Sequence, residues 1–345
     1  MGSEDFHRAC DALVQAAVGD NPAFSDLLPQ VMGMAQQVPP DDLSAALPRL
    51  ADGLAKAQPS LAGWLAVMSG AWVENGAAPE AVGLPLVERA TEVMTEALAF
   101  ARAWSEATGD APPDMEQSAP SQEIVNTIGP KLGDAAVSAM LSWFSLPQFA
   151  MGTTTILQNS AIVRGAISDR ERRAHLAGEL AEHHGHMVYV RDLLRVLEGE
   201  RLLVLDRASR QGWTVTIAGI GDNFQLHMLL GGALLGRPGC MPGEPLAPEW
   251  VSWFTNQDPP GKVVVTSPWN LVDGHGAWIY NEGVPADIPA INGTRVVVLD
   301  APSYARHFPA GRRFPMMDAT LTIEGVHHPE DLAAWWPHIA PDRGQ

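Results

Sequence analysis

The sequence predicts an α+β protein in which an all-helical N-terminal half precedes a smaller mixed α/β domain. Apolar residues recur at helical spacing as far as about residue 197. After Glu200 the pattern changes to short β-branched or aromatic runs separated by turn residues. We therefore expect a helical domain over residues 1–115, a second helical segment over 121–198 packed on it, and an α+β domain over 199–345.

The N-terminal region reads as a series of helices separated by proline-containing breaks. Pro39-Pro40 and Pro59-Ser60 each precede a new apolar periodicity, and a longer helix is expected after Pro85. The segment GDAPPDMEQSAP, at residues 109–120, is polar and proline-containing, which is typical of a linker. Helices should resume at about Ser121.

The stretch 135–163 carries no charged residue, which raises the question of a membrane span. It contains Pro147, three consecutive threonines and several amide side chains, and these are costly in hydrocarbon. We interpret it as buried helix and loop, with a break near 147–155. The last expected helix of this half covers residues 169–197.

The C-terminal domain should contain several short strands and two helices. Each expected strand is rich in β-branched or aromatic residues and is bounded by turn residues. The expected strands are 202–205, 213–217, 263–266, 278–280, 296–299 and 321–323, and the expected helices are 222–235 and 329–336.

The stretch 212–236 holds three local signals in order. Residues 213–217 alternate apolar and small polar side chains, as a half-buried strand does. A Gly-Ile-Gly turn follows, and then Asp222 with Gln225 three residues later, the spacing of a capping box. The helix should end at Gly236. We predict a strand, a glycine turn and a helix capped by Asp222.

The charge balance excludes some partners. The chain has 345 residues and a net charge of −18, with most of the excess acidity in its first third. Such a surface repels phosphate backbones, so we expect no nucleic-acid partner. Anionic membrane surfaces are disfavoured for the same reason. The acidity also serves solubility, which is the simpler interpretation.

The two cysteines, Cys10 and Cys240, are far apart in the sequence and match neither a disulfide framework nor a zinc-finger spacing. We expect reduced thiols in a cytoplasmic protein. The first ten residues, MGSEDFHRAC, are polar and lack the apolar core of a signal peptide.

Three C-terminal segments have a distinctive sequence: GIGDNFQLH at 219–227, NLVDGHGAWIYNEGVPADIP at 270–289 and VVVLDAPSYARHFPAGRRFP at 296–315. They resemble segments of a family of uncharacterised proteins encoded in actinobacteria. The resemblance covers roughly residues 202–315. It implies a bacterial cytoplasmic protein and carries over no activity and no catalytic residue.

Three side chains in the second helical segment suggest a metal site. Glu179, His183 and His186 fall at i, i+4 and i+7, so on a continuous helix they would share one face. A carboxylate and two imidazoles could hold a divalent transition metal with a fourth ligand from elsewhere. A solvated polar face is the alternative, and Gly185 weakens the helix at this point.

Polar residues of the C-terminal domain form the other candidate site, each with a structural alternative. Asp222 and Asn223 are also simple cap residues, and His227 borders an apolar helix face. The polar residues of 270–287 could line a site or reflect turn chemistry alone, and Asp273–His275 reads as a hairpin turn. This group comprises Asn270, Asp273, His275, Asn281, Glu282 and Asp287. The arginines at 306–313 could bind an anion or pair with internal carboxylates such as Asp300 and Asp318. The candidates are Asp222, His227, His275 and Arg312 for catalysis, and Asn223, Asn270, Asp273, Glu282, Arg306 and Arg313 for ligand binding.

Two functional hypotheses follow. The first is an enzyme or small-molecule binder, with the Asp222 turn, the Asp273–His275 loop and the 306–313 segment meeting around one pocket. The second is a non-catalytic adaptor whose helical half binds a protein partner through Trp64, Trp72 and Trp104, since tryptophan is enriched in interface hot spots. The sequence contains no GxSxG, Walker or GxGxxG motif, so a dinucleotide site is not expected.

Overall fold

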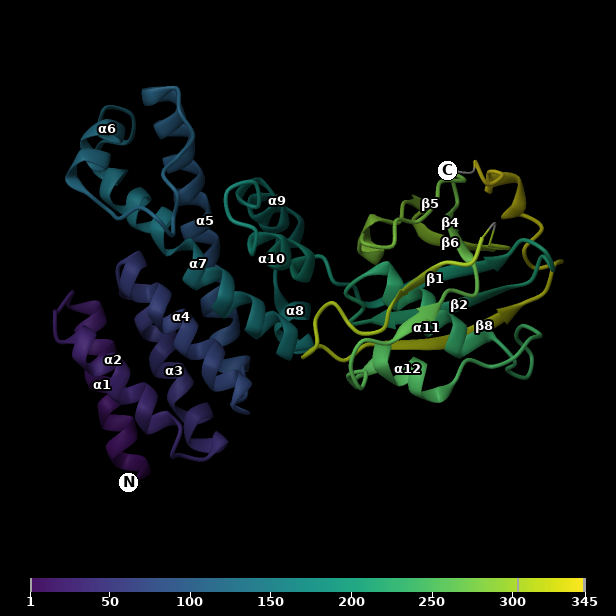
Figure 1. Ribbon diagram of the computed structural model, residues 1–345, viewed down its shortest axis with the longest axis horizontal. Coiled ribbons are helices and arrows are strands. Elements are labelled where there is room, and N and C mark those ends of the chain that lie inside the picture. Colours follow the sequence, from purple (N-terminus) through teal and green to yellow (C-terminus); the bar gives the residue numbers. More distant parts are fainter. Residues whose placement is uncertain (1, 303, 344–345) are drawn as a thin grey trace. The chain divides into compact units, whose positions relative to one another are not determined.

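The computed structural model describes residues 2–302 and 304–343 and divides into two compact units, Met1–Leu194 and Arg195–Gln345 (Figure 1). The first unit is helical and the second is built around a mixed sheet, so the predicted fold class is confirmed. The second unit begins a few residues before the expected domain start at residue 199. The two helical regions expected separately fall together in the first unit, apart from the residues just before 198.

The first unit begins with two short-loop helical hairpins and continues through longer helices. Proline stands at the first turn of the third and fourth helices, where its missing N–H has no partner to lose. The helices are α1 (Ser3–Val18), α2 (Phe24–Ala35), α3 (Pro40–Lys56), α4 (Pro59–Glu74), α5 (Glu80–Thr108), α6 (Gln122–Leu132), α7 (Ala136–Asn159), α8 (Ala161–Ala166), α9 (Arg170–Leu180) and α10 (Met187–Leu194), with a 3₁₀ turn η1 (Gly133–Ala135).

The α5–α6 connection lies where the linker was predicted, and Ser121 caps α6 by accepting a hydrogen bond from Ile124 N at 3.3 Å. The break expected near 147–155 is wrong, because α7 runs unbroken through Pro147. Helix α7 packs against both α4 and α5. A Cβ atom added at Gly152 would come within 2.4 Å of Ala66 O, so glycine lets α4 and α7 approach closely. Packing on both sides stabilises a helix that proline alone would interrupt.

No helix within the described residues is both long enough and apolar enough to cross a membrane. The uncharged stretch 135–163 is largely α7, whose buried side chains include Trp143 and Phe149. The interpretation as buried helix is thus right, although the loop expected within it does not form.

The second unit has a six-stranded sheet with the strand order β4-β6-β1-β2-β8 and with β5 paired to β6. Strands β1 and β6 are parallel, and the other neighbouring pairs are antiparallel. The strands are β1 (Glu198–Asp206), β2 (Gly212–Ala218), β4 (Asn270–Asp273), β5 (Ala290–Ile291), β6 (Thr294–Asp300) and β8 (Thr320–His327). A separate two-stranded sheet pairs β3 (Val264–Thr266) with β7 (His307–Pro309).

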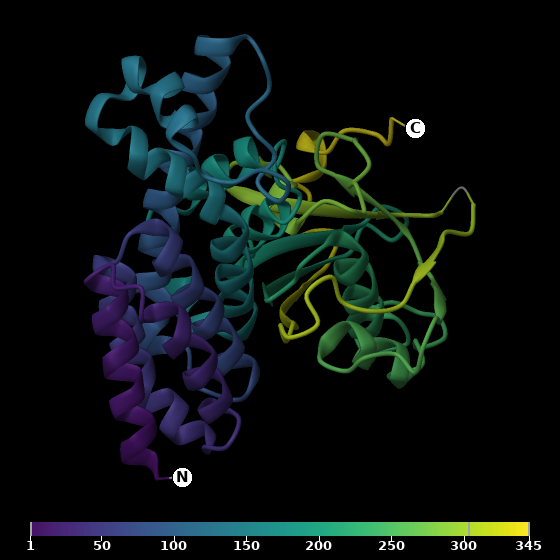
Figure 2. The ribbon, with the colours of Figure 1, turned by 60° about the vertical axis from the view of Figure 1, so that its left-hand side comes forward.

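Each face of the six-stranded sheet has its own apolar cover. On one face, Val215 and Val297 pack with Leu230 of helix α11 (Asn223–Leu234) and Phe254 of helix α12 (Pro248–Thr255). On the other face, buried residues including Val298 pack with apolar residues of the C-terminal segment, namely Leu332, Trp335, Trp336 and Ile339. Figure 2 shows these two layers on opposite sides of the sheet. The alternation of inward side chains along β1 and β6 follows from the two-residue period of a strand.

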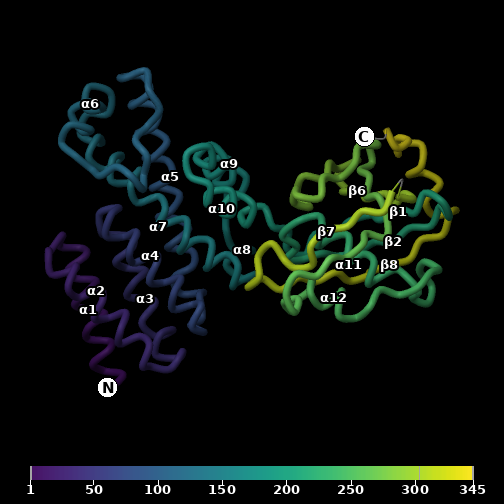
Figure 3. The backbone as a smooth tube through the Cα atoms, viewed as in Figure 1, coloured from purple at the N-terminus to yellow at the C-terminus, as the bar shows by residue number. Residues whose placement is uncertain are grey.

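Strand β7 lies beside the N-terminal end of α11, as the chain trace shows (Figure 3). The rings of Phe308 and Phe224 are in contact there, with centroids 4.7 Å apart. This contact joins the small sheet to the helix and places the segment 304–309 next to the start of α11.

Two expectations for the second unit are wrong, and one of its helices was not predicted. Residues 278–280 form one bridge, Val272 to Trp278, instead of a strand, because the chain then turns to meet the start of α11. Residues 329–336 form turns and a short 3₁₀ segment, η3 (Trp336–His338), instead of a helix. Helix α12 was not predicted; Pro248 at its first turn is the signal that could have revealed it.

Candidate functional site

The strand, glycine turn and capped helix predicted over residues 212–236 are confirmed. Strand β2 ends at Ala218, and Gly219 has a φ of +67°, a left-handed conformation that favours glycine. Asp222 caps α11, its Oδ1 accepting a hydrogen bond from Gln225 N at 2.8 Å. The Gln225 side chain reaches back and accepts from Gly221 N at 2.8 Å, one residue before the position of a standard capping box.

The first turn of α11 is held by the loop at residues 280–283. Asn223 N donates to Asn281 O at 3.1 Å and to Gly283 O at 2.9 Å, and Phe224 N donates to Asn281 O at 3.2 Å. The Asn223 amide Nδ2 donates to Tyr280 O at 2.7 Å. These carbonyl groups occupy N–H groups that a helix N-terminus would otherwise offer to an anion. The helix start therefore positions this loop instead of binding an anion itself.

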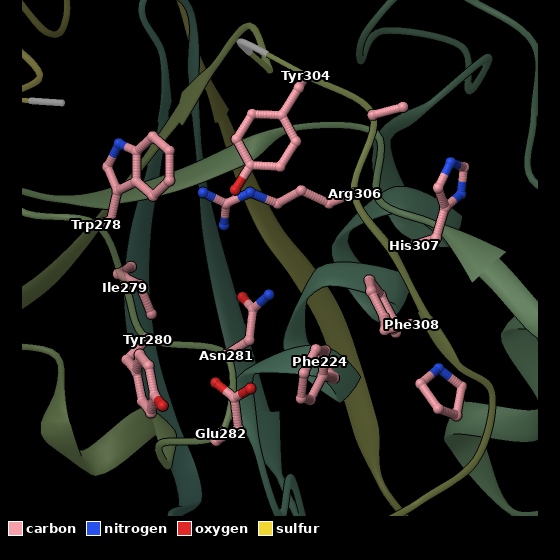
Figure 4. Close-up of a pocket in the computed structure, with 12 residues that line it drawn as sticks. Phe224, Trp278, Ile279, Tyr280, Asn281, Glu282, Tyr304, Arg306, His307 and Phe308 are labelled. Atoms are coloured by element: carbon pink, nitrogen blue, oxygen red, sulfur yellow. The ribbon is translucent and has the colours of Figure 1, made fainter. Parts of the chain in front are cut away.

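A pocket of about 460 Å³ opens beside this loop (Figure 4). Three separate segments line it: Phe224 from α11, the residues 278–282, and the residues 304–309 that include β7. Its lining combines aromatic rings with polar side chains, which are Asn281, Glu282, Arg306 and His307, together with the Tyr280 and Tyr304 hydroxyls. Aromatic walls with a few polar groups are typical of small-molecule sites.

Arg306 is the cation of this pocket. Its guanidinium carbon lies 3.9 Å from the centre of the Trp278 ring and 5.4 Å from that of Tyr304. The two ring centres are 6.5 Å apart, so the rings meet the guanidinium from adjacent sides. Arg306 Nε and Nη2 are buried, and neither has a hydrogen-bond partner among the described residues. Buried guanidinium N–H groups without acceptors are costly, which marks them as sites for a ligand or water oxygen.

His227 lies behind the pocket wall and is fully buried. Ser267 Oγ donates to Trp269 O at 2.6 Å, so its oxygen accepts from His227 Nδ1–H, also at 2.6 Å. That contact leaves His227 Nε2 as the lone-pair nitrogen, and Nε2 has no partner among the described residues. Burial, together with the smaller effect of the Arg306 charge, lowers the pKa of His227 to about 3.

Asn281 connects His227 to the pocket. Its side chain lines the pocket and lies close enough to His227 to offset part of the lowering of the histidine pKa. The contact does not reach hydrogen-bond geometry, and Asn281 Oδ1 is buried without a partner among the described residues. In Figure 4 the Asn281 amide points toward the Arg306 guanidinium. Unpaired buried polar atoms of Arg306, Asn281 and His227 are therefore neighbours.

Asp222 and Arg313 support the pocket from outside. Burial raises the pKa of Asp222 to about 6, against the opposing effects of the Gln225 N–H and the Arg313 charge. Arg313 Nη1 donates to Glu282 O at 3.1 Å and so fixes the loop at the pocket mouth. Of the predicted site residues, Glu282 and Arg306 line the pocket and His227 adjoins it. Asn223 and Arg313 donate to the pocket loop, whereas Asp222 caps α11.

Other predicted residues do not line this pocket. Asp273 and His275 belong to the predicted turn, in which Asp273 Oδ1 accepts from His275 N at 2.8 Å. That turn packs against the C-terminal segment: Arg343 N donates to Gly276 O at 2.9 Å. Asn270 lies in β4, where it pairs with Asp300 of β6, and it is buried there without lining the pocket. The pocket is therefore not the one we expected: residues 278–282 line it instead of the Asp273–His275 loop, and of the 306–313 segment only residues 306–309 take part.

Arg312 has an internal ion-pair environment. Its side chain is 4% exposed, and it contacts Asp258 at 3.0 Å and Asp318 at 3.7 Å. Arg312 Nη1 also donates to Met317 O at 3.3 Å. The pairing with Asp318 matches the structural alternative considered for this residue. Asp300 pairs with Arg207 at 2.7 Å.

The helix that would align the metal candidates is absent. Helix α9 ends at Leu180, and turns follow until α10 begins at Met187, so Glu179, His183 and His186 do not share one helix face. Glu179 pairs with Arg102 at 2.7 Å, while the His183 ring packs on Trp143. Gly185 lies in the second of these turns, where glycine disfavours a continuous helix. The described residues contain no group of three His, Cys, Asp or Glu side chains placed to hold a metal ion.

The proposed adaptor anchors differ in exposure. Trp72 is fully buried against Phe6, and Trp104 is half-buried beside Phe100. Trp64 alone among these three is largely exposed, at 43%. One exposed ring does not define a contiguous apolar surface, so the adaptor hypothesis stays a prediction.

Three residues that the pocket depends on received no assigned role from the sequence. Ser267 lies in a short loop after β3 and gave no signal of its own. Trp278 was predicted to lie in a strand, and Asn281 was considered within the polar group 270–287 but was not assigned to ligand binding. Side-chain polarity in a proline-bounded loop was the available signal.

Comparisons of the chain with protein-family models, with curated proteins and with solved structures gave no match. The chemistry of the site therefore rests on the geometry of this chain.

Proposed function

We propose that the C-terminal unit binds a small, flat organic anion in the pocket lined by Arg306. One observation carries this proposal: Arg306 presents buried N–H groups without acceptors beside aromatic rings. Nε and Nη2 lie on one edge of the guanidinium, and this edge matches two oxygens of a carboxylate. The rings of Trp278, Tyr304 and Phe308 supply apolar surface for the flat part of the ligand.

The pocket's size fits this ligand class. A cavity of about 460 Å³ lies within the range of small-molecule sites. Glu282 is the acidic group of the lining and is exposed at the pocket mouth, so a singly charged anion is favoured over a polyanion.

A matched ligand pair tests this proposal. Naphthalene-2-carboxylate should raise the melting temperature of the protein and bind in calorimetry, whereas 2-naphthamide should bind much more weakly, because it lacks the charge that Arg306 attracts. Arg306→Gln should abolish the preference for the acid.

Arg201→Gln serves as the control variant, since Arg201 is an exposed arginine of the same unit with only a 3.9 Å contact to Glu324. It should bind both compounds as the unaltered protein does. An unchanged preference in Arg306→Gln, or no binding of acid or amide at any concentration tested, would exclude the proposal.

We also infer a cytoplasmic location as part of this proposal. Cys10 and Cys240 are both free thiols, which suits a reducing compartment. Burial raises the pKa of the Cys10 thiol to about 12, so this thiol stays protonated and unreactive. The resemblance to actinobacterial proteins also favours a cytoplasmic location.

A further inference from the structure

The unpaired polar atoms at the inner end of the pocket are chemically complementary. Arg306 Nε and Nη2 are donors, whereas Asn281 Oδ1 and His227 Nε2 are acceptors, and all four atoms are buried without partners among the described residues. A group that both accepts and donates would satisfy the two sets together. A plain carboxylate accepts only and would leave the acceptors unpaired, at a cost.

Ser267 decides which nitrogen of His227 can accept. The Ser267 hydroxyl proton is used on Trp269 O, so the serine oxygen takes the proton of His227 Nδ1. The proton on Nδ1 leaves a lone pair on Nε2, and the buried ring stays neutral. His227 Nε2 is thus a fixed acceptor that faces the Asn281 amide.

Two acceptors, His227 Nε2 and Asn281 Oδ1, then adjoin one another. A half-turn of the Asn281 amide about its last side-chain bond relieves this, because Nδ2–H then donates to His227 Nε2. The same half-turn directs Oδ1 toward the pocket, beside the Arg306 donors. The Ser267–His227 pair is in this way a positioning device for Asn281, and Asn281 is the group that touches the ligand.

We propose that the pocket selects a carboxylate that carries an adjacent N–H or O–H: Arg306 binds the carboxylate, and Asn281 Oδ1, oriented by His227 and Ser267, accepts the neighbouring hydrogen. This inference rests on the proposed function and specifies its ligand class. Buried protein groups that bind both the carboxylate and the neighbouring hydrogen discriminate strongly between ligands. A ligand without the N–H or O–H leaves a buried acceptor of the protein unsatisfied.

Two probes of nearly equal shape test the selection. Indole-2-carboxylate has an N–H beside its carboxylate, and benzofuran-2-carboxylate has a ring oxygen at that place. Calorimetry on the full chain should show the indole acid binding about tenfold more tightly, the ratio expected for one hydrogen bond made or lost. Asn281→Ala should bring the two dissociation constants together by weakening only the indole acid.

Ser267→Ala tests the positioning role. It should also reduce the ratio of the two dissociation constants, with little change for benzofuran-2-carboxylate, and the ¹⁵N NMR signals of His227 should lose the single-tautomer pattern with the proton on Nδ1. Ser252→Ala, which removes a serine hydroxyl bonded to Glu249 O in α12, should keep both the ratio and the tautomer.

The possible outcomes separate the two proposals. Equal binding of both probes that still requires Arg306 overturns the selection and leaves the proposed function standing. No binding of either probe, together with no response to naphthalene-2-carboxylate, overturns both. If NMR of the protein without ligand shows the proton of His227 on Nε2, the positioning role is overturned. The comparison of the two probes uses the unaltered protein, so it does not depend on whether a variant folds.

Discussion

Two buried titratable residues beside the pocket loop make the folding stability depend on pH in opposite directions. Asp222, with a pKa raised to about 6, holds its proton more tightly in the folded protein than in the unfolded chain. His227, with a pKa lowered to about 3, holds its proton less tightly in the folded protein. A pKa that differs between the folded and unfolded states makes the free energy of unfolding depend on pH. Each residue therefore affects stability over its own pH range.

Asp222→Asn should stabilise the protein at neutral pH. The stability that a raised carboxyl pKa confers is complete below the unfolded value of 3.8 and is lost as the pH rises through about 6. Asparagine caps a helix about as well as aspartate and carries no charge to bury. The gain at pH 7.5 should be no more than about 3 kcal/mol and should vanish near pH 3.5. Denaturant unfolding at both pH values measures this, and a variant less stable at pH 7.5 would contradict it.

His227 should make the protein sensitive to mild acid. A lowered histidine pKa contributes stability that is present above the unfolded value of 6.5 and is lost as the pH falls toward 3. His227→Gln should remove this dependence, flattening the melting temperature between pH 6.5 and 4. The exposed residue His275 provides the control, since His275→Gln should keep the full slope. Parallel curves for all three proteins would show that His227 is not the group responsible.

At the scale of elements, glycine decides how close α4 and α7 can approach. Gly70 and Gly152 face each other across the two helices, and a Cβ added at Gly70 would lie 3.3 Å from the Gly152 Cα. The Cβ of an alanine at position 152 would come far inside contact distance of the Ala66 backbone. Backbone atoms cannot yield as the end of a side chain does, so the helices would have to separate.

Gly152→Ala should therefore destabilise the protein by about 1–3 kcal/mol, the usual cost of overpacking a core. Gly33 in α2 is the matched control, because an added Cβ there meets nothing within 4 Å. Gly33→Ala should raise the free energy of unfolding by about 0.5–1 kcal/mol through better helix propensity. Urea unfolding of both variants checks the pair. Stabilisation by both alanines would mean that α4 and α7 are not in close contact.

At the scale of the whole molecule, each of the two units has its own apolar core. The first buries side chains such as Trp72, Phe100 and Trp143 among helices, and the second buries two clusters on the faces of its sheet. Units with separate cores can fold alone. Residues 1–194 and 195–345, produced separately, should each show a cooperative thermal transition and the expected helical or mixed circular dichroism spectrum. A fragment that stays unfolded would show that its core depends on the other unit.

The sequence by itself determined the features that depend on neighbours along the chain. The strand, the Gly219 turn and the Asp222 cap lie within a few residues of one another, and their hydrogen bonds are local, so their pattern predicted them. The change from helical to strand periodicity near residue 198 likewise fixed the fold class. Local signals failed where tertiary packing outweighed them: α7 continues through Pro147 because two helices enclose it.

Only the tertiary structure decided which polar residues meet. Arg306, His227 and Asn281 come from three distant segments, and their proximity follows from the pairing of β3 with β7 and from the docking of the 280–283 loop on α11. The same packing drew Arg312 into ion pairs with Asp258 and Asp318 and turned the Asp273–His275 loop toward the C-terminal segment. Arginines six residues apart look equivalent in a sequence, but burial and available partners differ at each place, and these alone separate a binding group from an internal ion pair.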